Sequence, residues 1–317
     1  MAYSAGDPIL DDEYNTFVNS SSDPFGYNHF AGPGSGVYGL NQSTIATVSA
    51  GDTVNASSWN ALFTGMDNIA NHTNTSITAS SVSAGDTIAI RSALISDLAN
   101  LAAAVAGGST SATALGTNAV GSSTSAATYN TSATIERSVT FANNNTMRAF
   151  FNAGGKIRID PSVTTGIDGS KDDVFNDLTV TATGNLDIGS LTSTRSGSGE
   201  TLTTNGLALG FHDLTDSYQT ILKLTSDNSG YTSNTVEYFA KLDAAVASAT
   251  VITIKMVATD AAADTTFTAG NTDGVAANPN EAPKITLALI EVHPTNAQGL
   301  ASNIQSASNA EVSNSTS

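Results

Sequence analysis

From Ile135 onward the chain alternates apolar and polar residues in runs too short for helices, and this pattern most constrains the fold. The runs at residues 138–141 and 156–160 repeat every second residue, as in strands with one buried face. Similar runs cover residues 178–183, 207–211, 220–225, 235–241, 249–258 and 284–292, separated by Gly- and Asn-containing turns. Such a series of short strands predicts an antiparallel β-sandwich over residues 135–294.

Residues 44–107 predict a small two-helix unit. The segment VSAGDT at residues 48–53 recurs at residues 82–87, and apolar residues with helical spacing follow each copy. We expect helices near residues 57–71 and 89–106. Their facing sides would carry Trp59, Leu62, Phe63 and Met66 on the first helix and Leu94, Leu98 and Leu101 on the second.

Three further segments show no sustained helical or strand periodicity in their apolar residues. Residues 1–43 predict an extended N-terminal arm, residues 108–134 a linker rich in Gly, Ser, Thr and Ala, and residues 295–317 a polar tail that a partner would have to order. The predicted fold is therefore mainly β, with a C-terminal antiparallel β-sandwich preceded by an extended arm and a small helical unit.

The arm is rich in aromatic residues although it has no pattern that would build a core. We therefore expect it to bury these side chains against another copy or another protein, the alternative being that it folds back on its own helical unit. The predicted assembly contacts in the arm are Tyr14, Phe17, Phe25, Tyr27, Phe30 and Tyr38.

A second group of predicted assembly contacts lies near residue 150. Phe150 and Phe151 precede a Gly-containing turn, which favours a hairpin with one ring in the core and the other at a subunit contact. Arg158, on the return strand, belongs to a locally basic stretch, whereas residues 1–90 contain no Lys or Arg. This asymmetry predicts complementary surfaces on neighbouring copies, the alternative being two ordinary solvated faces.

Composition excludes several functional classes. The 317 residues carry a formal net charge of −17 and no cysteine, which excludes disulfides, thiol nucleophiles and cysteine metal sites. Nucleic-acid binding is not expected because phosphate neutralisation needs clustered Lys and Arg. No apolar run suggests a membrane span or an N-terminal leader, so we expect synthesis in a cytoplasm without membrane partners.

The side chains that carry chemistry do not form a recognisable motif. The four histidines, His29, His72, His212 and His293, are far apart in the sequence and fit no paired-histidine metal motif. A calcium loop at residues 168–173 would lack the usual twelve-residue spacing and would have the cation of Lys171 between its carboxylates. We therefore expect no catalytic residue, cofactor or bound metal, and a protein that is not an enzyme.

Several segments resemble virion structural proteins of tailed bacteriophages, including those of cyanobacteria. The most specific is FFNAGGKIR at residues 150–158; the others are VSAGDT at 48–53, SWNAL at 58–62, and YSAGD at 3–7 followed by DDEYN at 11–15. The resemblance implies a tail-associated particle protein, a fibre, fibre adaptor or baseplate component. Such a protein would be made in the host cytoplasm and would assemble with itself and other virion proteins.

Two alternatives stay open at this stage. One is a capsid decoration or neck protein. The other is a receptor module whose sandwich binds a host surface glycan, for which the candidate aromatic residues are Tyr218, Tyr231 and Tyr238.

Overall fold

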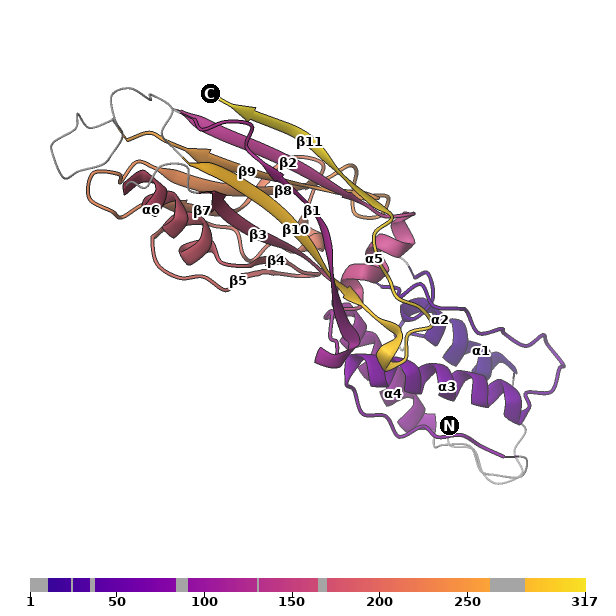
Figure 1. The fold of residues 1–317 in the computed structure, drawn as a ribbon. Helices are drawn as coiled ribbons and strands as arrows, with labels where there is room; N and C mark the ends of the chain where they lie inside the picture. The colour runs from indigo at the N-terminus through magenta and orange to yellow at the C-terminus, as the bar shows by residue number, and fades with distance from the viewer. Residues whose placement is uncertain are drawn as a thin grey trace. The chain divides into compact units, whose positions relative to one another are not determined.

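The computed structural model describes residues 11–23, 25–34, 38–83, 91–129, 131–164, 170–262 and 283–317. The chain forms two compact units (Figure 1). The helical unit comprises residues 1–116, 143–155 and 293–305, and the sandwich unit comprises residues 117–142, 156–292 and 306–317. Segments of the two units alternate along the chain, whereas the domains predicted from the sequence are continuous.

The helical unit contains five α-helices among its described residues. They are α1 (Asp11–Asn19), α2 (Tyr27–Phe30), α3 (Ala56–Thr73), α4 (Arg91–Ala106) and α5 (Asn144–Asn152), with short 3-10 turns η1 (Ala112–Ala114) and η4 (Asn296–Gln298). Helices α3 and α4 lie where the sequence predicts two helices, and they pack against each other. The second copy of the repeat lies largely outside the described residues.

Helix α3 shows why the sequence folds this way locally. The Asn55 side chain accepts a hydrogen bond from the Ser58 amide at 3.0 Å, which caps the helix at its start. At the other end Asn74 has φ 56°, a left-handed conformation that stops the helix. The predicted facing residues of α3 and α4 are at most 3% exposed, so the amphipathic stripes form the core of this unit. No described helix of the protein is both long and apolar enough to cross a bilayer.

The sandwich unit consists of two antiparallel sheets, which confirms the predicted mainly-β sandwich. The five-stranded sheet has the order β1-β10-β3-β4-β5, and the six-stranded sheet has the order β11-β2-β9-β8-β7-β6. The strands are β1 (Leu115–Thr124), β2 (Ser132–Thr140), β3 (Lys156–Thr164), β4 (Leu186–Ile188), β5 (Ser193–Arg195), β6 (Thr201–Asn205), β7 (Gln219–Thr225), β8 (Thr235–Leu242), β9 (Val251–Thr259), β10 (Lys284–Pro294) and β11 (Ser308–Thr316).

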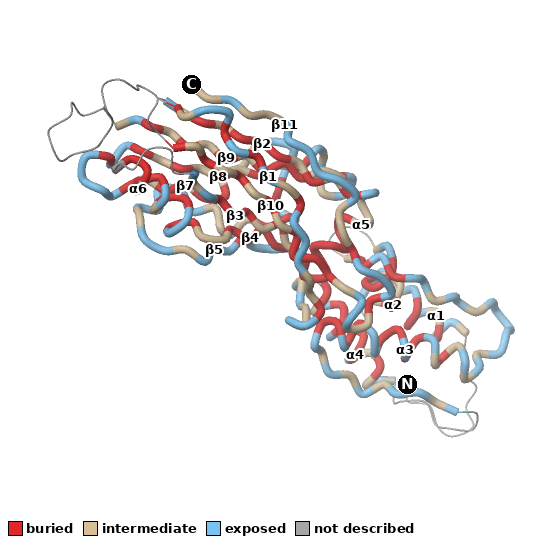
Figure 2. Tube along the Cα trace, viewed as in Figure 1, coloured by how far each residue is buried: buried red, intermediate tan, exposed pale blue. Residues whose placement is uncertain are grey.

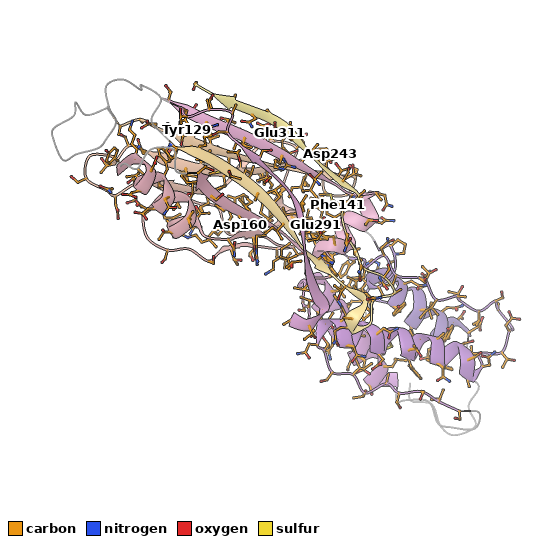
Figure 3. All side chains as sticks on the ribbon, in the orientation of Figure 1. Tyr129, Phe141, Asp160, Asp243, Glu291 and Glu311 are labelled. Carbon is orange, nitrogen blue, oxygen red and sulfur yellow. The ribbon has the colours of Figure 1, made fainter. Side chains whose placement is uncertain are left out.

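Alternating burial along the central strands forms the core of the sandwich. In β8, for example, Val236, Tyr238, Ala240 and Leu242 are at most 1% exposed, and the residues between them are of intermediate exposure. Figure 2 shows buried positions along the strands of both sheets. Polar side chains then hold the turns and edges. Asp243 accepts hydrogen bonds from the amides of Thr250 and Val251 at 2.9 and 3.0 Å, closing the β8–β9 turn (Figure 3).

Two predicted strands have other structures. Residues 178–183 belong to a π-helix, η2 (Asp177–Thr183), which follows α6 (Ser170–Asn176). The Thr183 hydroxyl donates to the Leu178 carbonyl at 2.8 Å, so a residue with high strand propensity supports helical backbone here. Residues 207–211 form a turn leading into η3 (Phe211–Asp213), because Gly210 packs its backbone directly against Leu191.

The predicted linker and tail also form strands. The linker segment contains β1 and the start of β2, and the tail contains β11, which pairs with β2 in antiparallel register. The Ser317 carbonyl accepts hydrogen bonds from the amides of Thr131 and Ser132. Backbone pairing orders these polar edge strands within the chain itself, so a partner is not needed to order the tail.

Candidate assembly surface

The described part of the predicted arm is folded rather than extended. Helix α1 places Tyr14 and Phe17 against Trp59, with ring centroids 5.3 and 6.0 Å away. Both side chains are at most 3% exposed, and the Tyr14 hydroxyl donates to the Ser58 carbonyl at 3.1 Å. Tyr14, Phe17 and Val18 have the spacing of one helical face. This indication of a helix covers only one turn, in a segment between Pro8 and Pro24.

Helix α2 buries two more of the predicted contacts. Tyr27 is 5% and Phe30 is 0% exposed, with ring centroids 5.9 Å apart. Tyr27 fits against α3 because Gly65 has no side chain there; a Cβ at Gly65 would lie 2.8 Å from the Tyr27 ring. Four of the six arm residues therefore fill the core of their own unit, and their prediction as assembly contacts is wrong.

The other two arm residues form a partly exposed ring cluster with His29. Phe25 stacks on His29 with centroids 4.5 Å apart and planes 7° apart, and Tyr38 lies 4.8 Å from Phe25 and 4.7 Å from His29. All three side chains are of intermediate exposure. We call Phe25, His29 and Tyr38 the aromatic triad. Burial lowers the pKa of His29, which favours its neutral form.

Contacts with α5 hold the triad's backbone in place. Arg148 donates to the carbonyls of Pro33 and Tyr38 at 3.3 and 3.4 Å, and Asn152 donates to the Gly39 carbonyl at 3.1 Å. Arg148 is only 5% exposed. Of the triad, Tyr38 is thus held through its backbone carbonyl by a buried arginine, which limits the conformational entropy that this residue would lose on binding a partner.

Phe150 and Phe151 lie in α5, so the predicted hairpin is wrong. The Asn143 side chain accepts from the Thr146 amide at 2.9 Å and caps this helix. Both rings are fully buried, with centroids 5.0 Å apart in an edge-to-face arrangement. Neither is a surface for a second subunit, because a helix buried on several sides takes both adjacent rings into the core.

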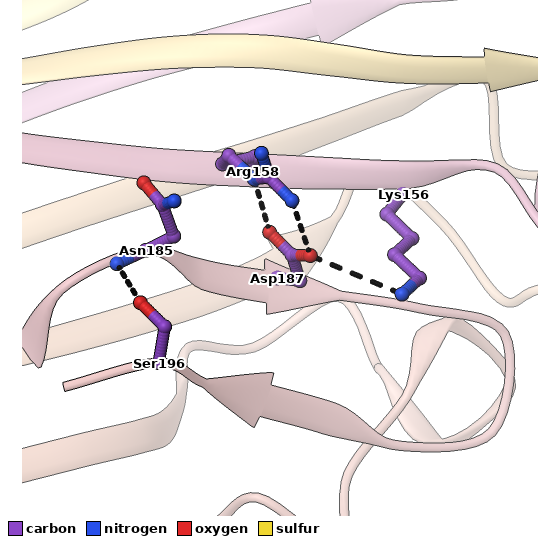
Figure 4. Close-up of polar contacts among 5 residues, drawn as sticks. All are labelled: Lys156, Arg158, Asn185, Asp187 and Ser196. Carbon is purple, nitrogen blue, oxygen red and sulfur yellow. Dashed lines mark hydrogen bonds and ion pairs between the residues drawn. The ribbon is translucent and has the colours of Figure 1, made fainter. Parts of the chain in front are cut away.

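Arg158 is engaged within its own sheet. Its Nε and Nη2 donate to the two Asp187 carboxylate oxygens at 2.7 and 3.0 Å, and Lys156 Nζ lies 3.9 Å from the same carboxylate (Figure 4). The hydrogen bonds to Asp187 raise the pKa of Arg158, although burial acts in the opposite direction. Arg158 thus forms a bidentate ion pair between β3 and β4 and keeps partial exposure, and its assembly role stays a prediction.

The outer face of the six-stranded sheet carries a cluster that sequence reasoning missed. Lys255 Nζ lies 3.9 Å from the Tyr218 ring centroid and 4.4 Å from that of Phe239, and Lys241 Nζ lies 4.5 Å from Tyr218. Strand register places Glu136 and Phe239 on either side of Lys255. These residues, Tyr218, Phe239, Lys241, Lys255 and Glu136, are the Tyr218 cluster. Phe239 and Lys241 stand at alternating positions of one predicted strand, but their meeting with Lys255 and Tyr218 depends on strand register, which the sequence does not show.

The Tyr218 cluster also revises the glycan hypothesis. Tyr231 is 6% and Tyr238 is 0% exposed, so both are core residues. Burial first, and the Glu136 carboxylate second, raise the pKa of Tyr218 above its ordinary value. Of the three candidate aromatic residues, Tyr218 alone has intermediate exposure, and lysine ammonium groups lie over its ring.

The residues considered for chemistry have structural contacts. His72 is fully buried, its Nε2 lies 3.1 Å from the Ala153 carbonyl oxygen, and burial lowers its pKa. Lys171, in α6, has its Nζ 2.8 Å from Asp260 Oδ2 in a buried ion pair. Asp168, the first carboxylate of the calcium loop considered in the sequence, lies outside the described residues. Within the described ranges, no three His, Asp or Glu side chains are grouped to hold a metal ion.

Comparison of the chain with protein-family models, with curated proteins and with solved structures gives no match.

Proposed function

We propose that the protein is a structural component of a tailed-bacteriophage particle, associated with the tail as a fibre, fibre adaptor or baseplate component. It acts by assembly of multiple copies and with other virion proteins rather than by catalysis. The proposal builds on the resemblance of residues 150–158 and the N-terminal segments to such proteins. The aromatic triad is the structural feature that supports it.

The triad has the properties of an anchor for a protein partner. Its three rings contact one another and keep partial exposure, in a unit whose neighbouring rings Tyr14, Phe17 and Phe30 are buried. Aromatic residues are enriched in protein interfaces because they bury a large area with few rotatable bonds. Covering the triad would remove apolar ring surface from water without disturbing the core beneath it.

Incorporation into particles tests this role. We expect the Phe25→Ser/Tyr38→Ser double variant to fold but to enter particles with at least about ten-fold lower occupancy, since it loses two interface rings. Leu202→Ser is the matched control, because Leu202 is another partly exposed apolar residue, 36% exposed and far in sequence on β6. Circular dichroism would verify folding. Wild-type occupancy of the double variant would refute the triad as an assembly contact.

A further inference from the structure

Apart from Lys284, the Lys and Arg side chains that the structure describes make two kinds of contact. Most of them bind oxygen acceptors within their own unit: Lys156 and Arg158 at Asp187, Lys171 at Asp260, Lys223 at Glu237, Arg137 at the Ser122 carbonyl, Arg148 at the Pro33 and Tyr38 carbonyls, and Arg195 at the Ala182 carbonyl. Lys241 and Lys255 instead hold their ammonium groups over aromatic rings on the outer face of the six-stranded sheet.

The helical unit presents the opposite charge. Residues 1–90 contain eight carboxylates and no Lys or Arg. Four of these carboxylates belong to exposed residues of the described structure: Asp12, Asp23, Asp52 and Asp67. Arg148, a cation that this unit draws from later in the chain, is buried and donates inward. The described surface of the helical unit is therefore anionic.

We infer that the Tyr218 cluster is a docking surface for the helical unit of a second copy of this chain. The two lysines of the cluster outnumber its one carboxylate, Glu136, which lies opposite Lys255 in the β2–β9 pair, so the cluster has a net positive charge that attracts the exposed carboxylates of the helical unit. The cluster also adds ring area of the kind that dominates interface energies. A lysine over an aromatic ring is partly desolvated, so its attraction to a carboxylate is screened less than that of a fully solvated lysine. This inference rests on the proposed function, since it names the partner in multi-copy assembly.

Such a contact would be heterologous. The Tyr218 cluster belongs to the sandwich unit and the exposed aspartates to the helical unit, so each copy offers one of each surface. A pairing of unlike patches does not close on itself in a two-fold dimer; repeated, it builds a ring or an open fibre. Because the two surfaces lie on different units of the chain, their pairing favours head-to-tail assembly over a symmetric dimer.

A charge swap between two variants tests the inference. In the Lys241→Glu/Lys255→Glu chain both surfaces are acidic, and in the Asp12→Lys/Asp23→Lys/Asp52→Lys/Asp67→Lys chain both are basic. Sedimentation velocity at about 0.1 M salt would follow assembly, where the Debye length is about 10 Å. We expect the wild type to assemble, each variant alone to assemble at least about ten-fold more weakly, and an equal mixture of the two to recover assembly.

Lys284→Glu is the control, because it makes one of the same Lys→Glu replacements, half the charge change of the double variant, on β10 of the other sheet and should leave assembly unchanged. Circular dichroism would verify that every variant folds. The inference is overturned if the wild type stays monomeric, if the Lys241→Glu/Lys255→Glu chain assembles like the wild type, or if the mixture does not assemble. The particle-incorporation experiment with the wild type and Phe25→Ser/Tyr38→Ser is separate from this one. If the wild type enters particles but the charge swap fails, the docking inference fails and the proposed function does not.

Discussion

At the scale of single residues, close packing of Gly65 against Tyr27 makes the helical unit sensitive to one methyl group. Gly65→Ala gains about 1 kcal/mol of helix propensity, but its Cβ would lie 2.8 Å from a buried ring. Overpacking costs about 1–3 kcal/mol, so we expect the free energy of unfolding to fall. In a Tyr27→Ala background the same change should stabilise the unit. Urea unfolding of the four chains measures this coupling, and equal effects of Gly65→Ala in both backgrounds would contradict it.

His72 makes stability depend on pH. Burial lowers its folded-state pKa below the ordinary 6.5, so the unfolded chain binds the proton more tightly. Its contribution to stability is complete above the unfolded pKa and is lost as pH falls through the lower, folded pKa. We expect His72→Gln to flatten the decrease in unfolding free energy below about pH 6.5. Because burial also lowers the pKa of His29, the comparison belongs in a His29→Gln background. An unchanged pH profile would count against the buried neutral imidazole.

The role of a residue as part of the core was predictable where the residue belonged to a long periodic pattern. Trp59 and Leu98 were recognisable as core because each belongs to a stripe of several turns. The sequence indicated that Tyr14 and Phe17 must be buried against some other surface. The single helical turn around them did not show that Trp59 of the same unit provides that surface. Lys255 and Tyr218 meet across strands and a loop, a proximity that depends on register and carries no local signal.

At the scale of elements, a buried arginine connects β2 with the edges of both sheets. Arg137 donates to the Ser122 carbonyl on β1 at 3.0 Å and to Asn309 Oδ1 on β11 at 2.8 Å. Gly121 leaves room for it, since a Cβ there would lie 2.5 Å from Arg137 Nη2. We expect Arg137→Ala to lower the free energy of unfolding by about 1–3 kcal/mol, because the buried Ser123 hydroxyl and the partly buried acceptors of Ser122 and Asn309 all lose their donor.

Two further variants make this measurement specific. Arg137→Lys should recover part of the loss, because one ammonium group cannot reproduce the fork of a guanidinium. Ser138→Ala, at the neighbouring outward-facing position of β2, should change stability by less than about 0.5 kcal/mol. Equal denaturation midpoints for Arg137→Ala and Ser138→Ala would disprove the connecting role.

The elements that the sequence identified are those with one apolar face. Strands β2, β3, β7, β8, β9 and β10 alternate clearly and were found. Strand β11 is polar on both faces and is held by backbone hydrogen bonds to β2, so hydrophobic periodicity could not reveal it. The pair Phe150 and Phe151 has high strand propensity, yet the Asn143 cap and tertiary burial favour a helix.

At the scale of the whole molecule, the helical unit depends on segments from three parts of the chain. The Gln42 side chain accepts from the Ala301 amide at 2.7 Å, and His72 contacts the Ala153 carbonyl. A fragment of residues 1–107 lacks α5 and its two buried phenylalanines. We expect this fragment to show little cooperative unfolding by circular dichroism, whereas the full chain unfolds cooperatively. A fragment with native-like thermal unfolding would show that the unit is independent of its later segments.

The central claim, that the protein acts by assembly within a tailed particle, is tested most directly by a cryo-EM map of purified phage particles whose genome encodes it. We predict density for the chain in the tail, with the aromatic triad covered by a neighbouring subunit. Copy number in the same map separates a tail component, in tens of copies or fewer, from a capsid decoration protein in hundreds. Particles that lack the chain, or that contain it with Phe25 and Tyr38 facing solvent, would contradict the account.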